Sequence, residues 1–163
     1  MVGIRWQKVA SAAAVGLLAL KFLVISQYFL EFETNGAGGP FSDALNNLSE
    51  ALVTQTEEPV YITDWGMLNS LRLLQQGRLD LRDVEQAFRE DHAGGSVQPS
   101  IASMLADRKA IFVGHTAGNE VIVGEREGFE RKAQYMGLHK HMMQVNRDSN
   151  GRPFFEVFRL APL

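Results

Sequence analysis

The sequence predicts one N-terminal transmembrane helix followed by a small layered α/β domain with a mixed sheet of about four strands. Three observations predict this class. Residues 9–32 form a long apolar run, short apolar runs alternate with helical periodicity between residues 42 and 136, and a hairpin signal follows. The chain therefore divides into an N-terminal segment, a membrane helix, a glycine-rich hinge and a domain, at residues 1–8, 9–32, 33–41 and 42–163.

The apolar run at residues 9–32 contains one charged side chain away from its ends, Lys21. At about 1.5 Å per residue a helix of this length crosses a hydrocarbon layer of roughly 30 Å. A cleavable signal peptide has a shorter apolar region, of about 7–15 residues, that ends in small residues. Residues 27–30, with the sequence QYFL, fit such a cleavage site poorly. We therefore expect a membrane anchor.

The charges flanking the run predict its orientation. Arg5 and Lys8 precede it, whereas Glu31 lies at its C-terminal end and Glu33 follows it. Basic residues favour the cytoplasmic side, so the N-terminus is expected in the cytoplasm of a bacterial cell and the domain on the periplasmic side of the inner membrane. The formal net charge of -3, with basic residues scattered among acidic ones, argues against a nucleic-acid partner. The chain contains no cysteine, which excludes disulfides and thiolate chemistry.

Lys21 lies near the middle of the predicted span, where a lysine costs about 2.5–3.5 kcal/mol on insertion scales. Either its long stem reaches toward a headgroup, or its ammonium group meets a polar partner on a neighbouring helix. Ala12, Gly16 and Ala19 form a small-residue face that would allow a second backbone to approach closely. These residues predict an integral membrane protein partner in addition to the lipid bilayer.

Within the domain, periodicity and turn residues predict the order of the elements. Ser42 is a candidate N-cap, Gly77 a candidate helix end, and Asn150-Gly151 a hairpin turn. The predicted helices cover residues 42–52, 64–77, 80–91, 99–105 and 125–136, and the predicted strands cover residues 60–62, 110–113, 138–146 and 153–160.

Two segments that follow predicted strands contain candidate ligand-binding side chains. Asp64 and Trp65 follow the first strand, and His115 and Asn119 lie at the end of the second. Ligands of α/β sheets bind beyond the carboxyl ends of strands, where Asp64 could accept a sugar hydroxyl and Trp65 could stack on a ring. The alternative is structural: Asp64 caps a helix, Trp65 lies in the core, and residues 114–119 form a turn.

His139 and His141 would share a face of a strand, as two metal ligands could. A third ligand is not evident nearby, and Lys140 adds a positive charge. We therefore expect no metal site and no cofactor. Neither a nucleophile–base arrangement nor a pair of carboxylates with catalytic spacing is recognisable, so the chain is not expected to be an enzyme.

Several stretches together resemble the C-terminal part of bacterial integral-membrane glycosyltransferases that use polyprenyl-phosphate sugars, the dolichyl-phosphate-mannose-transferase-like class. They are residues 39–44 (GPFSDA), 60–66 (VYITDWG), 71–77, 110–115 (AIFVGH) and 151–160. The resemblance implies a last membrane helix that leads into a small extracytoplasmic α/β domain. In that family the catalytic acidic residue lies in an early loop between membrane helices. This chain lacks such a loop, so no catalytic residue is carried over.

Together these features predict a non-catalytic, single-pass accessory subunit. Its helix would dock in a larger bacterial membrane complex, such as an energy-transducing, respiratory or photosynthetic assembly, and its domain would cover the periplasmic face. The alternative is a glycosyltransferase-derived domain that binds a glycan or a lipid-linked sugar on the outer side of the membrane.

Overall fold

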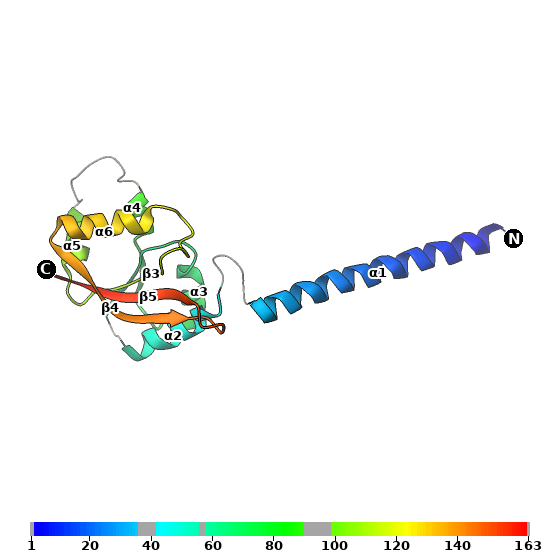
Figure 1. Ribbon diagram of the computed structural model, residues 1–163, viewed down its shortest axis with the longest axis horizontal. Helices are drawn as coiled ribbons and strands as arrows, with labels where there is room; N and C mark the ends of the chain where they lie inside the picture. The colour runs from blue at the N-terminus through cyan, green and yellow to red at the C-terminus, as the bar shows by residue number, and fades with distance from the viewer. Residues whose placement is uncertain (1, 36–41, 56–57, 90–98, 163) are drawn as a thin grey trace. The chain divides into compact units, whose positions relative to one another are not determined.

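The structure is a computed structural model that describes residues 2–35, 42–55, 58–89 and 99–162. The chain divides into two units, Met1–Gly38 and Gly39–Leu163. The predicted class is confirmed: a long apolar N-terminal helix precedes an α/β domain whose mixed sheet ends in a hairpin (Figure 1). Most of the predicted hinge, residues 36–41, lies outside the described residues.

The first unit contains helix α1, Val2–Asn35. Its segment Lys8–Glu31 has a mean hydropathy of 2.1 over 24 residues, and none of the segment is buried. By length and composition this helix could cross a membrane, and a signal sequence at the N-terminus would satisfy the same two criteria.

The second unit contains a five-stranded sheet with the strand order β2-β1-β3-β5-β4. The parallel part contains β2 (Leu81–Asp83), β1 (Val60–Ile62) and β3 (Ile111–His115). Strand β5 (Pro153–Pro162) pairs antiparallel with β3 and with β4 (Leu138–Arg147). Parallel neighbours need a crossover connection, and the helices after β1 and β2 supply it.

Helices cover both faces of the sheet (Figure 1). Helices α2 (Ala44–Gln55) and α3 (Leu68–Gln75) pack on one face against the alternate strand residues Val60, Ile62, Ile111, Val113 and Val157. Helices α4 (Glu85–Arg89), α5 (Pro99–Ala106) and α6 (Glu125–Tyr135) pack on the other face against Tyr61, Phe112, Phe158 and Leu160. The central strands are buried on both faces, which explains why they are continuously apolar.

Two local predictions were wrong. Residues 81–83 form strand β2 instead of the start of a long helix, because Leu81 pairs with Val60 and is buried at the edge of the sheet. Pairing with β1 outweighs the local helical pattern of this segment. The predicted N-cap at Asp64 is also wrong, because α3 begins at Leu68, has Met67 at its N-cap position, and has no side-chain cap there.

Gly114 in β3 lies close to the end of β1. A Cβ atom added at Gly114 would lie 2.7 Å from Thr63 Oγ1, and Thr63 is itself held by a hydrogen bond to the Val113 carbonyl. We expect Gly114→Ala to lower the free energy of unfolding by about 1–3 kcal/mol, because a packed core resists added atoms. Chemical denaturation would measure it. The matched double variant Gly114→Ala/Thr63→Ala removes the clashing oxygen and should be less destabilised than the sum of the single variants; full additivity would contradict the clash.

Candidate functional site

The carboxyl ends of β1 and β3 bring together two of the predicted site residues, Asp64 and His115. The two strands are parallel neighbours, and the Thr63 amide donates a hydrogen bond to the Val113 carbonyl at 2.9 Å. The side chains that follow therefore meet: His115 Nδ1 lies 2.6 Å from Asp64 Oδ2. A carboxylate is an acceptor, so the imidazole tautomer that fits this contact donates its Nδ1–H to Asp64.

This Asp64–His115 pair is enclosed. The His115 side chain is 1% exposed and that of Asp64 is 6% exposed. Asp64 Oδ1 accepts the Trp65 backbone N–H at 2.7 Å, and the imidazole packs against the rings of Phe154 and Phe155. His115 Nε2 has no hydrogen-bond partner among the described residues. The arrangement orients an imidazole within the core and shields it almost completely from solvent.

Trp65 and Asn119, the other two predicted cleft residues, do not join this pair. Trp65 is 46% exposed, which excludes the core position considered from the sequence. Asn119 Nδ2 donates hydrogen bonds to Thr116 Oγ1 at 2.8 Å and to the Pro153 carbonyl at 3.0 Å. Asn119 thus connects the loop after β3 to the start of β5, as expected of a structural turn.

A cavity of about 10 Å³ lies at these strand ends. Its lining includes Asp64 and His115 but neither Trp65 nor Asn119. A space of this size is about one water-sized probe, so it is too small for a sugar or any other organic ligand.

A second polar cluster, on β4, β5 and α6, was missed by the sequence analysis. Glu156 on β5 is 4% exposed, and its Oε1 lies 2.5 Å from Lys140 Nζ. Lys140 extends over the ring of Phe158 at 4.3 Å and also contacts Glu130 Oε1 at 3.3 Å. Arg126 on α6 donates to Glu130 Oε1 at 3.1 Å and lies 3.9 Å from Glu156 Oε2. This ionic cluster ties α6 to the hairpin.

The charges of this ionic cluster stabilise one another. Burial opposes the ionised form of Glu130, but the hydrogen bond from Arg126 and the charge of Lys140 outweigh it and lower the pKa of this carboxyl. Burial likewise opposes the charge of Arg126, but the charge of Glu156 and the hydrogen bond to Glu130 raise the pKa of the guanidinium. Glu130 and Arg126 are therefore held in their charged forms.

His139 and His141 are exposed on β4, which lies at the edge of the sheet. The described part of the chain contains no group of three or more His, Cys, Asp or Glu side chains that could hold a metal ion. Lys140, which lies between the two histidines in the sequence, belongs to the ionic cluster.

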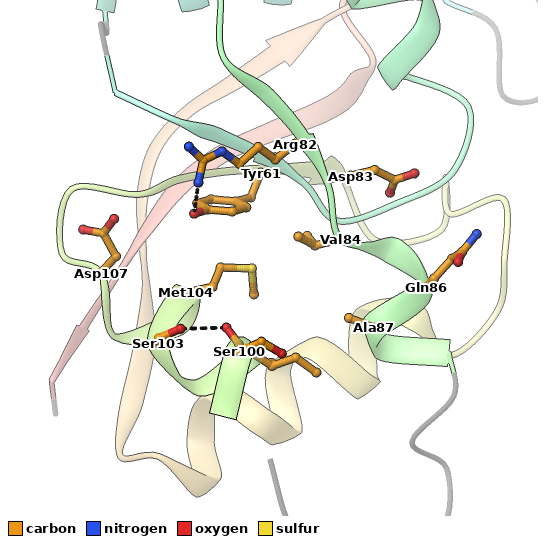
Figure 2. A pocket seen from close by; sticks show the side chains of 11 residues that line it. Tyr61, Arg82, Asp83, Val84, Gln86, Ala87, Ser100, Ser103, Met104 and Asp107 are labelled. Atoms are coloured by element: carbon orange, nitrogen blue, oxygen red, sulfur yellow. Dashed lines mark hydrogen bonds between the residues drawn. The ribbon is translucent and has the colours of Figure 1, made fainter. Parts of the chain in front are cut away.

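A larger cavity, of about 580 Å³, opens between the strands β1 and β2 and the helices α4 and α5 (Figure 2). The sequence analysis missed it, because residues 80–91 were predicted to form one helix, whereas β2 ends at Asp83 and the short helix α4 begins at Glu85. No motif marks the cavity. Its lining is assembled by the pairing of β2 with β1 and the position of α5.

The predicted partner-binding residues of α1 lie along an exposed helix. Ala12, Gly16, Ala19 and Lys21 are all exposed, and a Cβ atom at Gly16 would meet no atom within 4 Å. The apolar side chains around them are also exposed, among them Leu17, Leu18, Leu20, Phe22 and Leu23. A surface of this kind is stable against lipid or another apolar helix but not against water.

Comparisons of the chain with protein-family models, with curated proteins and with solved structures found no match.

Proposed function

We propose that the protein is a non-catalytic, single-pass accessory subunit of a bacterial inner-membrane complex. Helix α1 anchors it with the N-terminus in the cytoplasm and packs against a partner helix, and the α/β domain covers the periplasmic face of the complex. The observation that carries this proposal is Lys21, a charge near the middle of the exposed apolar segment Lys8–Glu31.

The cost of Lys21 is the physical reason for a partner. A lysine at the centre of a membrane helix costs about 2.5–3.5 kcal/mol, and an acidic side chain or free carbonyl on a neighbouring helix would offset much of it. Ala12, Gly16 and Ala19 leave room for a helix backbone to come close, so that van der Waals contact adds to the polar contact.

The buried ionisable groups of the domain support an accessory role, because they contact one another within the domain. Its most buried ionisable groups at the strand ends, Asp64 and His115, contact each other and are shielded from solvent. Lys140 connects strand β4 to Glu156 on β5 and to Glu130 on α6. These groups serve the rigidity of the domain, and a rigid cap on a membrane complex needs that property.

The alternative is recognition of a glycan or a lipid-linked sugar through Asp64, Trp65, His115 and Asn119. It has less support at that place, because Asp64 and His115 are enclosed while Trp65 and Asn119 lie outside their small cavity.

Lys21→Leu tests the proposal. In cells that express the full chain with a C-terminal affinity tag, this variant should recover the partner complex at least about tenfold less well after extraction in mild detergent, since about 1.4 kcal/mol changes an association constant tenfold. The matched control is Lys8→Leu, which removes a lysine at the end of the span. Equal recovery with Lys21→Leu and with the unmodified chain would contradict a paired lysine.

A further inference from the structure

The cavity between β1, β2, α4 and α5 has the dimensions of a small-molecule site. Its volume of about 580 Å³ lies within the range of about 300–1,000 Å³ that ligand pockets occupy. It is separate from the Asp64–His115 pair and from the ionic cluster, because neither contributes a lining residue. The proposed accessory role assigns nothing to it.

The middle of the cavity is apolar. Met104 on α5 and Tyr61 on β1 are buried and border it, and Val84 and Ala87 face them from the segment around α4 (Figure 2). This apolar middle of the cavity is therefore suited to packing against the C–H groups of a ligand. The Tyr61 ring is stacked on Phe112, and the Arg82 guanidinium lies 5.6 Å from its centroid, so the ring offers a ligand its edge and hydroxyl rather than a free face.

Polar side chains surround this apolar middle. Asp107 and Ser103 lie on one side, and Asp83 and Gln86 lie on the opposite side (Figure 2). Arg82 borders the cavity as well, and its guanidinium is fixed: it donates to Tyr61 Oη at 3.1 Å and to Asp80 Oδ2 at 2.6 Å. The lining thus presents hydroxyl, amide, carboxylate and guanidinium groups around an apolar centre.

The charges of the lining disfavour an anion. The positive charge of Arg82 is compensated by its ion pair with Asp80, and the carboxylates of Asp83 and Asp107 remain in the lining. Carboxylates accept hydrogen bonds, so they suit a ligand that donates hydroxyl groups. Asp83 Oδ1 and Asp107 Oδ1 each accept a backbone N–H, from Glu85 at 3.1 Å and from Lys109 at 3.0 Å, which fixes the position of both carboxylates.

We propose that this cavity binds a neutral polyhydroxylated ligand, such as a short oligosaccharide. A pyranose ring has apolar C–H faces and hydroxyl groups around its edge. The C–H face packs on Met104 and Val84, and the hydroxyls exchange hydrogen bonds with the carboxylates, amide and hydroxyls around them. Hydrogen bonds to charged acceptors are the stronger ones, so Asp83 and Asp107 supply most of the affinity.

The test uses the methionine methyl signals of the full chain, labelled with ¹³C-methyl methionine, in micelles of an amine-oxide detergent that carries no sugar headgroup. The chain has six methionines, and Met104→Leu assigns the signal of Met104. We expect at least one of maltose, lactose and N,N′-diacetylchitobiose to shift the Met104 signal saturably, with a Kd of about 1 mM. Met142 and Met143 on β4 do not line the cavity and should not shift.

Asp83→Asn and Asp107→Asn each keep an oxygen for the backbone N–H and remove the charge. We expect each variant to weaken the saccharide on the order of tenfold. The matched control, Glu127→Gln, removes an exposed carboxylate on α6 and should leave the affinity unchanged.

The proposal is overturned if none of the three saccharides shifts the Met104 signal saturably, or if inorganic phosphate or tetramethylammonium shifts it at lower concentration. It is also overturned if both Asp variants bind as well as the control. None of these results bears on the partner of α1.

Discussion

Asp64→Ala is expected to lower the free energy of unfolding of the domain by about 3–5 kcal/mol. It leaves the His115 imidazole and the Trp65 backbone N–H without their carboxylate acceptor, and each hydrogen bond to a charged group contributes about 1.5–3 kcal/mol. His115 would then keep two ring nitrogens in the core with no acceptor or donor among the described residues, because Nε2 already lacks a partner. The Trp65 backbone N–H would lose its acceptor too. Chemical denaturation of the full chain, followed by circular dichroism, would measure the change.

Two comparisons make this prediction specific. The double variant Asp64→Ala/His115→Ala should cost less than the sum of the two single variants, because the residues are in direct contact. Glu127→Gln, an exposed change on α6, should stay within about 0.5 kcal/mol of the unmodified chain. An Asp64→Ala variant as stable as Glu127→Gln would show that the enclosed pair does not hold the ends of β1 and β3 together.

Glu156→Ala should cause the second largest loss of stability. We expect it to lower the free energy of unfolding by about 2–4 kcal/mol, because it leaves Lys140 and Arg126 without their most buried counter-charge. The loss is smaller than for Asp64→Ala, since Glu130 remains beside both cations. The same denaturation experiment would measure it.

The double variant Glu156→Leu/Lys140→Met separates charge from packing. Replacing both members of a buried ion pair by apolar side chains of similar size is often neutral, so this variant should recover most of the stability that Glu156→Ala loses. A double variant at least as unstable as Glu156→Ala would mean that the cluster contributes through a specific geometry that apolar packing cannot replace.

The elements that the sequence predicted correctly are those whose signals are local. Residues 60–62 and 110–113 are continuously apolar because helices cover the sheet on both faces. Asn150-Gly151 marks the turn between β4 and β5. Strand β2 has a single buried residue, Leu81, and exists through its pairing with β1, which is a contact between distant segments that local pattern does not contain.

The sequence was likewise sufficient to select two residues of the candidate site but not to predict their surroundings. Asp64 and His115 could be selected because each follows a predicted strand, and their contact follows from the parallel pairing of β1 with β3. Their enclosure could not be predicted, since it depends on how Phe154 and Phe155 pack around the imidazole. The contact of Lys140 with Glu156 was missed because the two are not paired across the hairpin: Lys140 pairs with Leu160 and reaches Glu156 over Phe158.

The most direct test of the accessory-subunit proposal is the native mass of the particle that contains this chain, extracted from its own membrane in a mild detergent. The chain alone has a mass of 18.1 kDa. The proposal predicts a larger particle that contains at least one different integral membrane protein, with α1 still present at the N-terminus of the chain. A homogeneous 18.1 kDa monomer, or a chain from which α1 has been removed by cleavage, would contradict it.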